Sequence, residues 1–193
     1  TLPMDPTFSR LVDEGKVGPV GSSNFSPAQL VEADEASRAY GLVRFVSAQN
    51  EYSLYNRLAE DELVPACERF GIGLFPYFPL AYGLLTGKYR RDAAAPEGSR
   101  LANANQAGRL AGASWARIEA LQAFADARDL PLLTVAIGGL AAQPAVAGVI
   151  SGATRPEQIT SNVAAGEWEP SAADLAELDE LRHSTAFSYT TFA

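Results

Sequence analysis

The chain has few of the residue types that build disulfides, metal sites and membrane spans. Among its 193 residues are one cysteine, Cys67, and one histidine, His183. A single cysteine excludes an intramolecular disulfide and any metal site that needs several cysteines. No apolar run approaches the ~18 residues of a membrane-spanning helix, and the first residues lack the pattern of a signal peptide. These absences predict a cytoplasmic protein without membrane partners.

Basic residues are also scarce relative to acidic ones. The 15 lysines and arginines face 23 aspartates and glutamates, which gives a net charge of −8. This balance argues against general nucleic-acid binding. The 47% hydrophobic and 20% charged residues are ordinary for a soluble globular protein. The length predicts a single domain over residues 1–193, too short for a complete (β/α)8 barrel of roughly 250 residues.

Apolar segments with strand character alternate with helical patterns along the chain. Strands are predicted at residues 17–21, 43–49, 72–76 and 145–150. Pro19 weakens the first of these, because it removes one hydrogen-bond donor. The alternation predicts an α/β fold with a parallel sheet and right-handed crossovers.

Capping signals and helical spacing predict the helices. Ser26 and Gln29 form a capping box at the start of a helix that ends before Gly41. Other helices are predicted at 59–70, from Ser114, from Pro131 to Ala142, and from Ser171. Residues 80–113 show little periodicity and are predicted to form a long loop, which is usually functional or mobile. Residues 8–16 resemble the last turns of a helix closed by Gly15, so we expect the chain to be part of a longer polypeptide.

The segment after the last predicted strand has the features of an anion-binding helix start. Thr154 is the expected N-cap, Glu157 its capping-box partner, and Pro156 lies in the first turn. Gly152 permits close approach of a ligand to the backbone, and Arg155 adds a charge that can hold a phosphate. The alternative is a capped surface helix with an incidental arginine.

In parallel α/β folds, working groups lie beyond the carboxyl ends of the strands. The segments expected there are 22–24, 49–51, 77–80 and 152–155. They supply a hydroxyl, two amides, an aromatic face and an anion-binding turn. A ligand with an amide, an aromatic ring and a phosphate matches this set, and a nicotinamide dinucleotide has all three.

Four motifs in order resemble the aldo-keto reductase family. They are Gly15-Lys16-Val17 through Gly21-Ser22-Ser23-Asn24-Phe25, Gln49-Asn50-Glu51-Tyr52-Ser53-Leu54, Pro79-Leu80-Ala81 with Gly83-Leu84-Leu85-Thr86-Gly87-Lys88-Tyr89, and Gly152-Ala153 with Pro156-Glu157-Gln158. The resemblance is to the carboxy-terminal half of that family's TIM barrel, and it is strongest to the bacterial general-reductase and potassium-channel β-subunit branches. It implies a partial (β/α)8 barrel of about four parallel βα units with an extra C-terminal helix.

The resemblance also implies a site for NADP(H). Ser23, Asn24 and Gln49 would bind the carboxamide of the nicotinamide, and Tyr77 would stack on its ring. Arg155 would contact the 2′-phosphate. The other residues implied to contact the cofactor lie along the pyrophosphate or at the adenosine end: Pro79, Leu80, Ala81, Lys88, Arg100, Gly152, Thr154, Gln158 and Asn162.

The sequence departs from the family pattern at a few positions. Phe78 replaces a common serine and Ser161 a common glutamate, so the phosphate and adenosine contacts are expected to be reduced there. The pair Gly138-Gly139 replaces helix-favouring residues, which affects local packing rather than chemistry.

No catalytic residue is assigned to this chain, because the resemblance places the family's aspartate, tyrosine, lysine and histidine tetrad in the other half of the barrel. Tyr52 and Tyr55 follow the second predicted strand, but the family uses that region for packing. His183 is expected at the end of the last helix, on the surface.

Half a barrel leaves sheet edges unpaired, and open edges invite pairing with another chain. The expected partners are therefore a small carbonyl substrate and either a complementary half barrel or a second copy of the chain. Three functions remain open: part of an NADPH-dependent carbonyl reductase, a noncatalytic nucleotide-binding or regulatory module, or an assembly module that retains a relic site.

Overall fold

The computed structural model describes residues 5–184, and in it the chain divides into two compact units. Unit 1 contains the described residues up to Pro79 together with Gln143–Gly152. Unit 2 contains Leu80–Ala142 and the described residues from Ala153 onward. Within residues 5–184, no helix combines the length and the apolar character needed to cross a membrane.

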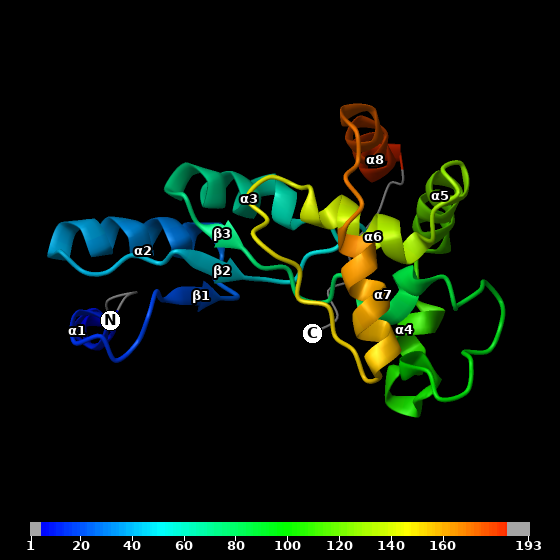
Figure 1. Ribbon diagram of the computed structural model, residues 1–193, viewed down its shortest axis with the longest axis horizontal. Coiled ribbons are helices and arrows are strands. Elements are labelled where there is room, and N and C mark those ends of the chain that lie inside the picture. Colours follow the sequence, from blue (N-terminus) through cyan, green and yellow to red (C-terminus); the bar gives the residue numbers. More distant parts are fainter. Residues whose placement is uncertain (1–4, 185–193) are drawn as a thin grey trace. The chain divides into compact units, whose positions relative to one another are not determined.

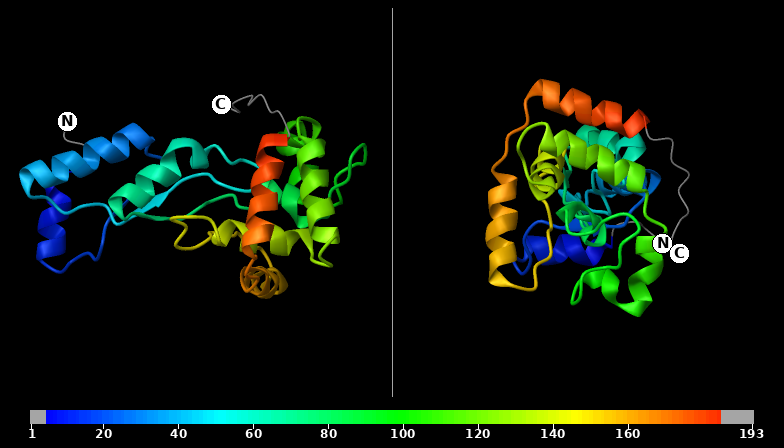
Figure 2. Two further views of the ribbon diagram at one scale, coloured as in Figure 1. Left: turned by 90° about the horizontal axis from the view of Figure 1, so that it is seen from above. Right: turned by 90° about the vertical axis from the view of Figure 1, so that its right-hand side faces the viewer.

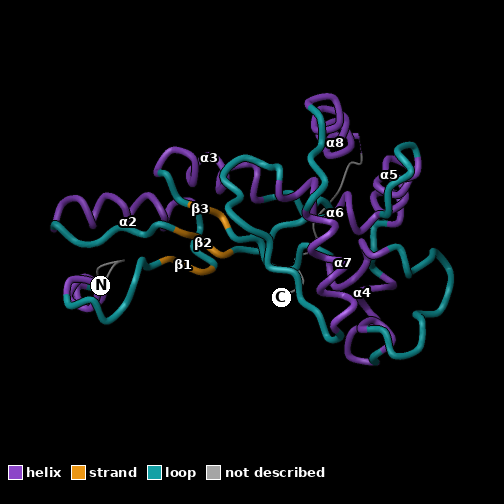
Figure 3. The backbone as a smooth tube through the Cα atoms, viewed as in Figure 1, coloured by secondary structure: helices purple, strands orange, loops and turns teal. Residues whose placement is uncertain are grey.

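Unit 1 is built on a parallel sheet of three short strands, which confirms the α/β class. The strands are β1 (Gly21–Ser23), β2 (Ser47–Gln49) and β3 (Gly73–Leu74), in the order β1-β2-β3. The tube in Figure 3 shows how little of the chain is strand compared with the connecting loops.

The strand predictions need correction in position and length. The first strand lies at 21–23 rather than 17–21, because Pro19 has no N–H for the ladder, and Ser22 and Ser23 are strand rather than turn. The second and third strands are shorter than 43–49 and 72–76. Residues 145–150 form no continuous strand: they meet the β3 segment through isolated parallel bridges and single backbone hydrogen bonds of 2.7–2.9 Å.

Two of the helices described in unit 1 begin at a side-chain N-cap, Asp5 or Ser26, and the third begins without one. They are α1 (Pro6–Asp13), α2 (Pro27–Tyr40) and α3 (Ala59–Phe70). The capping box predicted for α2 is confirmed: Gln29 N donates to Ser26 Oγ at 3.2 Å, and Ser26 N donates to Gln29 Oε1 at 2.8 Å. Gly41 ends the helix with a left-handed φ of 65°. The helices α2 and α3 connect neighbouring parallel strands and pack together beside the sheet (Figure 1).

Unit 2 is helical, and the segment predicted as a long loop contains short helical elements. Residues 80–113 contain the 3₁₀ turns η1 (Ala81–Thr86), η2 (Arg100–Ala102) and η3 (Ala104–Gln106), and the short helix α4 (Ala107–Ala111). These elements are too short to produce the 3.6-residue periodicity on which the loop prediction relied.

Four longer helices complete unit 2. They are α5 (Trp115–Asp126), α6 (Leu132–Ala141), α7 (Pro156–Gly166) and α8 (Ala172–Ser184), close to the predicted starts. The two views in Figure 2 show α8 lying along α5. Their shared core includes Ile118, Leu121, Phe124 and Leu178, all at most 5% exposed.

The sequence analysis expected the pair Gly138-Gly139 to affect local packing, and the surroundings of Gly138 show how. A Cβ at this position would lie 2.9 Å from the carbonyl oxygens of Ala165 and Trp168 and 3.1 Å from Trp168 Cβ. The absence of a side chain therefore permits the close packing of α6 against α7 and the segment that follows it.

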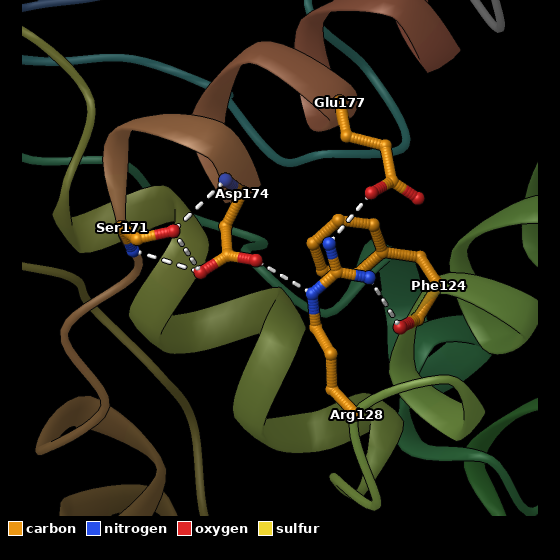
Figure 4. Close-up of polar contacts among 5 residues, drawn as sticks. All are labelled: Phe124, Arg128, Ser171, Asp174 and Glu177. Atoms are coloured by element: carbon orange, nitrogen blue, oxygen red, sulfur yellow. Dashed lines mark hydrogen bonds and ion pairs between the residues drawn. The ribbon is translucent and has the colours of Figure 1, made fainter.

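An arginine fixes α8 against α5. Arg128 donates to Asp174 at 2.6 Å, to Glu177 at 2.6 Å and to the Phe124 carbonyl at 3.1 Å (Figure 4). Its guanidinium lies 3.6 Å from the centroid of the Phe124 ring. Asp174 also accepts hydrogen bonds from the backbone and hydroxyl of Ser171, the predicted cap of α8.

Candidate functional site

The residues expected to hold a cofactor are divided between the two units. Ser23, Asn24, Gln49, Tyr77, Pro79 and Gly152 belong to unit 1. Leu80, Ala81, Lys88, Arg100, Thr154, Arg155, Gln158 and Asn162 belong to unit 2. Each group is described within its own unit.

Four of the unit 1 residues form a continuous hydrogen-bonded chain at the carboxyl ends of the strands. The Tyr77 hydroxyl donates to Asn24 Oδ1 at 2.8 Å, and Asn24 Nδ2 donates to Ser23 Oγ at 3.2 Å. Both Ser23 Oγ and Asn24 N donate to the Gln49 carbonyl, at 3.3 and 3.0 Å. The structure thus brings together Ser23, Asn24, Gln49 and Tyr77, which are up to 54 positions apart in the sequence.

The backbone also positions Asn24 and Tyr77. Asn24 has a left-handed φ of 58°, which asparagine adopts more readily than most residues. Tyr77 N donates to the Asn50 carbonyl at 3.0 Å, and Tyr52 N donates to the Tyr77 carbonyl at 3.3 Å. Phe78, at φ 54°, packs its ring edge-on against Tyr77 at a centroid distance of 5.2 Å.

The residues of this hydrogen-bonded chain are partly accessible and keep unused hydrogen-bonding capacity. Ser23, Asn24 and Gln49 are exposed, and the Tyr77 ring is half-buried. A primary amide has two donor hydrogens and an oxygen that can accept two bonds, so Asn24 retains one of each after its internal bonds. A planar carboxamide needs this combination of a donor and an acceptor.

The remaining unit 1 residues offer backbone rather than side-chain contacts. Pro79 is buried, and Gly152 is exposed. A Cβ at Gly152 would meet no protein atom within 4 Å, so packing inside the protein does not require glycine there.

In unit 2, the start of α7 differs from the predicted cap. Arg155, not Thr154, is the N-cap residue, because Pro156 takes the first helical position. The partner is Gln158 rather than Glu157: Gln158 Oε1 accepts from Thr154 N at 2.7 Å and from Arg155 N at 3.1 Å. Two backbone donors expected to face an anion are therefore already bonded within the protein.

The side chains at this helix start remain accessible. Thr154, Arg155 and Gln158 are exposed, and Asn162 is half-buried one turn along α7. Positive charge is therefore accessible here on the exposed Arg155 guanidinium, whereas the N–H groups of Thr154 and Arg155 are already bonded.

The segment after Pro79 carries a cluster of cations around two tyrosines. The guanidinium of Arg100 lies 5.2 Å from the centroid of the Tyr82 ring, and that of Arg109 lies 3.9 Å from it. Lys88 Nζ lies 5.2 Å from the Tyr89 ring. Arg109 was not identified from the sequence, because no periodic or motif signal connects it with Tyr82.

Leu80 and Ala81 begin this segment. The Leu80 carbonyl accepts from Gly83 N at 2.8 Å and Leu85 N at 3.2 Å, and Ala81 is buried with φ 46°. Both are held by the η1 turn.

Two residues considered for catalysis, Tyr52 and His183, lie in different parts of the fold. Tyr52 is fully buried and donates to Glu60 Oε1 at 2.7 Å, so it is a core residue, as expected. His183 lies near the end of α8, and its side chain is outside the described residues. Among the residues that the structure describes, no group of three histidine, cysteine, aspartate or glutamate side chains could hold a metal ion.

Comparison with known proteins identifies related sequences. Residues 6–183 match the aldo/keto reductase family. The chain is 37% identical over 166 residues to a probable voltage-gated potassium channel subunit beta of Arabidopsis thaliana, covering 83% of this chain and 50% of that protein. It is 31% identical over 186 residues to the NADH-specific methylglyoxal reductase of Escherichia coli, covering 90% and 51%. An uncharacterized oxidoreductase of Bacillus subtilis is 32% identical over 163 residues, covering 83% and 47%. The chain spans about half the length of these curated relatives.

Proposed function

Because this chain belongs to the aldo/keto reductase family, we propose that it is the NADP(H)-binding half of a reductase that converts aldehydes or ketones by hydride transfer. In this proposal its sheet and helices form part of a (β/α)8 barrel, about four βα units with an additional C-terminal helix, organised as one domain. The observation that supports the proposal best is the hydrogen-bonded chain from Tyr77 through Asn24 and Ser23 to the Gln49 carbonyl.

Each residue of this hydrogen-bonded chain would have a distinct role in binding the nicotinamide. Ser23, Asn24 and the Gln49 side chain would bind the carboxamide, and their bonds would fix the rotation of the nicotinamide ring. The Tyr77 ring would cover one face of the nicotinamide and exclude water from it. The bound cofactor would supply the hydride at the opposite face.

The remaining contacts would hold the phosphates and the adenosine. Pro79, Leu80, Ala81 and Gly152 would offer backbone surface along the pyrophosphate. Lys88 and Arg100 would add positive charge there. Arg155 would bind the 2′-phosphate with charge-assisted hydrogen bonds, next to Thr154, Gln158 and Asn162.

The alternative is a noncatalytic nucleotide-binding module that uses the same residues. This alternative needs no proton donor, and the Tyr52 hydroxyl of this chain cannot act as one for a carbonyl oxygen, because it is buried and bonded to Glu60. Turnover of an aldehyde by the chain with NADPH would exclude the module. Cofactor binding without turnover would fit both functions, because no catalytic residue is assigned to this chain.

Fluorescence titration of the full chain with NADPH and NADH tests the binding proposal. Asn24→Gly removes the amide without adding backbone strain and should weaken both cofactors. Arg155→Ser should weaken NADPH roughly 10- to 100-fold, because bonds to a charged group are lost, and should leave NADH within about threefold. Arg10→Ser, an exposed arginine of α1 paired with Glu14 at 3.8 Å, is the charge-matched control. Equal loss of NADPH and NADH in Arg155→Ser would refute the assignment of Arg155, and no binding by the folded wild type would refute the proposal.

A further inference from the structure

A buried ion pair and a buried hydroxyl meet where the loop after β2 joins the start of α3. Arg57 donates to Glu60 through Nε at 2.5 Å and through Nη2 at 2.8 Å. The Tyr52 hydroxyl donates to Oε1 of the same carboxylate at 2.7 Å. Tyr52 is fully buried, and only 6% of the Arg57 side chain and 12% of the Glu60 side chain are exposed. None of the three is among the residues proposed to contact the cofactor.

Such a group adds direction more than net stability. The desolvation of two buried charges offsets most of their attraction, so apolar side chains of the same volume are often equally stabilising. A guanidinium that binds both oxygens of a carboxylate, however, holds the carboxylate in one orientation. Glu60 is therefore fixed by Arg57, and it fixes the Tyr52 ring through the hydroxyl.

The loop between Tyr52 and Glu60 is short and bonded to itself. Ser53 N donates to the Asn56 carbonyl at 3.0 Å, and Asn56 N donates to the Ser53 hydroxyl at 2.9 Å. Glu60 N donates to the Arg57 carbonyl at 3.1 Å. Residues 52–60 therefore form one continuously bonded segment, with Tyr52 at its amino end.

The backbone of Tyr52 connects this segment with Tyr77. Tyr52 N donates to the Tyr77 carbonyl at 3.3 Å, and Tyr77 N donates to the Asn50 carbonyl at 3.0 Å. Residues 50–52 thus bind both polar groups of the Tyr77 backbone. Because β3 ends at Leu74, these bonds lie beyond its ladder, and the position of Tyr77 depends on where residues 50–52 lie.

We propose that Tyr52, Arg57 and Glu60 are positioning residues for Tyr77. They fix residues 50–52, and residues 50–52 fix the backbone that carries the Tyr77 ring. The inference rests on the proposed function, in which this ring covers one face of the nicotinamide. The three side chains act on cofactor affinity through Tyr77 and do not touch the cofactor. A group that only stabilised the fold would leave Tyr77 in place in the folded state of its variants.

Two substitutions loosen the group but keep its buried charges paired. Tyr52→Phe removes one hydrogen bond, and Arg57→Lys keeps the positive charge but loses the paired hydrogen bonds of the guanidinium. The matched control is Arg44→Lys, which makes the same change in another ion pair of unit 1. Arg44 binds the buried carboxylate of Asp34 and the Phe70 carbonyl rather than residues 50–52.

Nuclear magnetic resonance of the ¹⁵N-labelled full chain without ligand tests the positioning directly. The backbone amide signal of Tyr77 and the side-chain NH₂ signals of Asn24, which accepts a bond from the Tyr77 hydroxyl, report on the backbone and the ring of Tyr77. Both should shift in Tyr52→Phe and in Arg57→Lys and keep their wild-type positions in Arg44→Lys. These signals come from the folded state, so a loss of global stability alone does not move them.

Fluorescence titration with NADPH measures the consequence for binding. Tyr52→Phe and Arg57→Lys should each weaken NADPH roughly 2- to 10-fold, the value of about one hydrogen bond, and Arg44→Lys should bind like the wild type. In a Tyr77→Ala background the first two substitutions should have almost no further effect, because no ring remains to be positioned.

Unmoved signals of Tyr77 and Asn24 in both variants would overturn the proposal, and so would equal shifts in Arg44→Lys. Equal weakening of NADPH binding with and without the Tyr77 ring would show that the group does not act through Tyr77. If the folded wild type binds no NADPH, the proposed function fails, and the signals of the ligand-free chain still decide whether the group positions Tyr77.

Discussion

The hydroxyl of Tyr77 donates a 2.8 Å hydrogen bond to the side-chain oxygen of Asn24, 53 positions earlier in the chain. The bond joins the end of the β3 segment to the turn after β1. It fixes the ring that is proposed to face the nicotinamide relative to the amide that is proposed to bind its carboxamide. Ring and amide are thus positioned before any ligand arrives, which reduces the entropy lost on binding.

Removal of this hydroxyl should weaken cofactor binding without abolishing it. Tyr77→Phe keeps the ring but loses the bond to Asn24, whose value of about 0.5–1.5 kcal/mol predicts a weakening of roughly 2- to 10-fold. Tyr77→Ala also removes the stacking surface and should lose roughly another tenfold. NADPH fluorescence titration measures both effects. Tyr40→Phe, at a tyrosine that is 65% exposed, provides the control. Wild-type affinity in Tyr77→Ala would rule out a stacking role.

The contact of Asp174 with Ser171 and Arg128 should make stability depend on pH in the acid range. Hydrogen bonds from Ser171 and then from Arg128 lower the pKa of the Asp174 carboxyl from 3.8 to about 2. The folded state therefore binds this proton less readily than the unfolded state. The stabilisation is present above about pH 4 and is lost as the pH falls from about 4 towards 2.

Urea unfolding at pH 5, 3.5 and 2.5 measures this dependence. Asp174→Asn should be less stable than wild type at pH 5, and the difference should shrink by pH 2.5. Glu180→Gln, at an exposed position on the same helix, should follow the wild-type curve at every pH. A difference between Asp174→Asn and wild type that stays constant across this range would mean that the carboxyl titrates equally in both states.

Gly138→Ala should destabilise the fold even though alanine is the better helix former. Alanine gains about 1 kcal/mol of helix propensity over glycine. Its Cβ, however, would lie 2.9 Å from two carbonyl oxygens, those of Ala165 and Trp168, and backbone cannot move away cheaply. We expect a net loss of about 1–2 kcal/mol in the free energy of unfolding.

The control for this substitution is Gly108→Ala in α4, where a Cβ would meet nothing within 4 Å. It should be neutral or slightly stabilising in the same thermal or urea unfolding measurement. Equal changes in stability for Gly138→Ala and Gly108→Ala would contradict the close packing of α6 against the carbonyls of Ala165 and Trp168.

The parts of the fold that the sequence predicted well depend on local signals. Ser26, Gln29 and Gly41 mark both ends of α2 because caps act within a few residues of the backbone groups that they satisfy. The helix α3 was predicted from a different local signal, the helical spacing of Leu63, Val64 and Cys67 on one face. Strand limits were not, because pairing partners decide them: β1 begins at Gly21, where it pairs with Ser47.

For the candidate site, too, local features were predicted and tertiary contacts were missed. The composition of the strand ends suggested a nicotinamide dinucleotide, and the family resemblance assigned residues to it. The bonds that connect Tyr77, Asn24 and Ser23 are tertiary, and no spacing in the sequence specifies them. The predicted position of the α7 cap was wrong, because Pro156 takes the first helical position and makes Arg155 the N-cap, and Gln158 rather than Glu157 accepts from the backbone there. Arg109 was missed because only the folded segment brings it to Tyr82.

Cys67 should react with thiol reagents only when the protein unfolds. It lies on the inner face of α3 and is fully buried, and burial raises the pKa of its thiol from 9.0 to about 11. Since the thiolate is the reactive form, both access and ionisation disfavour modification near neutral pH. The rate of labelling by 5,5′-dithiobis(2-nitrobenzoate) at pH 8 should therefore be close to zero in buffer and rise with urea along the unfolding curve. Cys67→Ser keeps the size of the side chain but buries a hydroxyl, so it should abolish labelling and lower the unfolding midpoint. Cys67→Ala should also abolish labelling, but its unfolding midpoint should be closer to that of the wild type. Rapid labelling of the native protein would place the thiol at the surface and contradict the packing of α3 against the sheet.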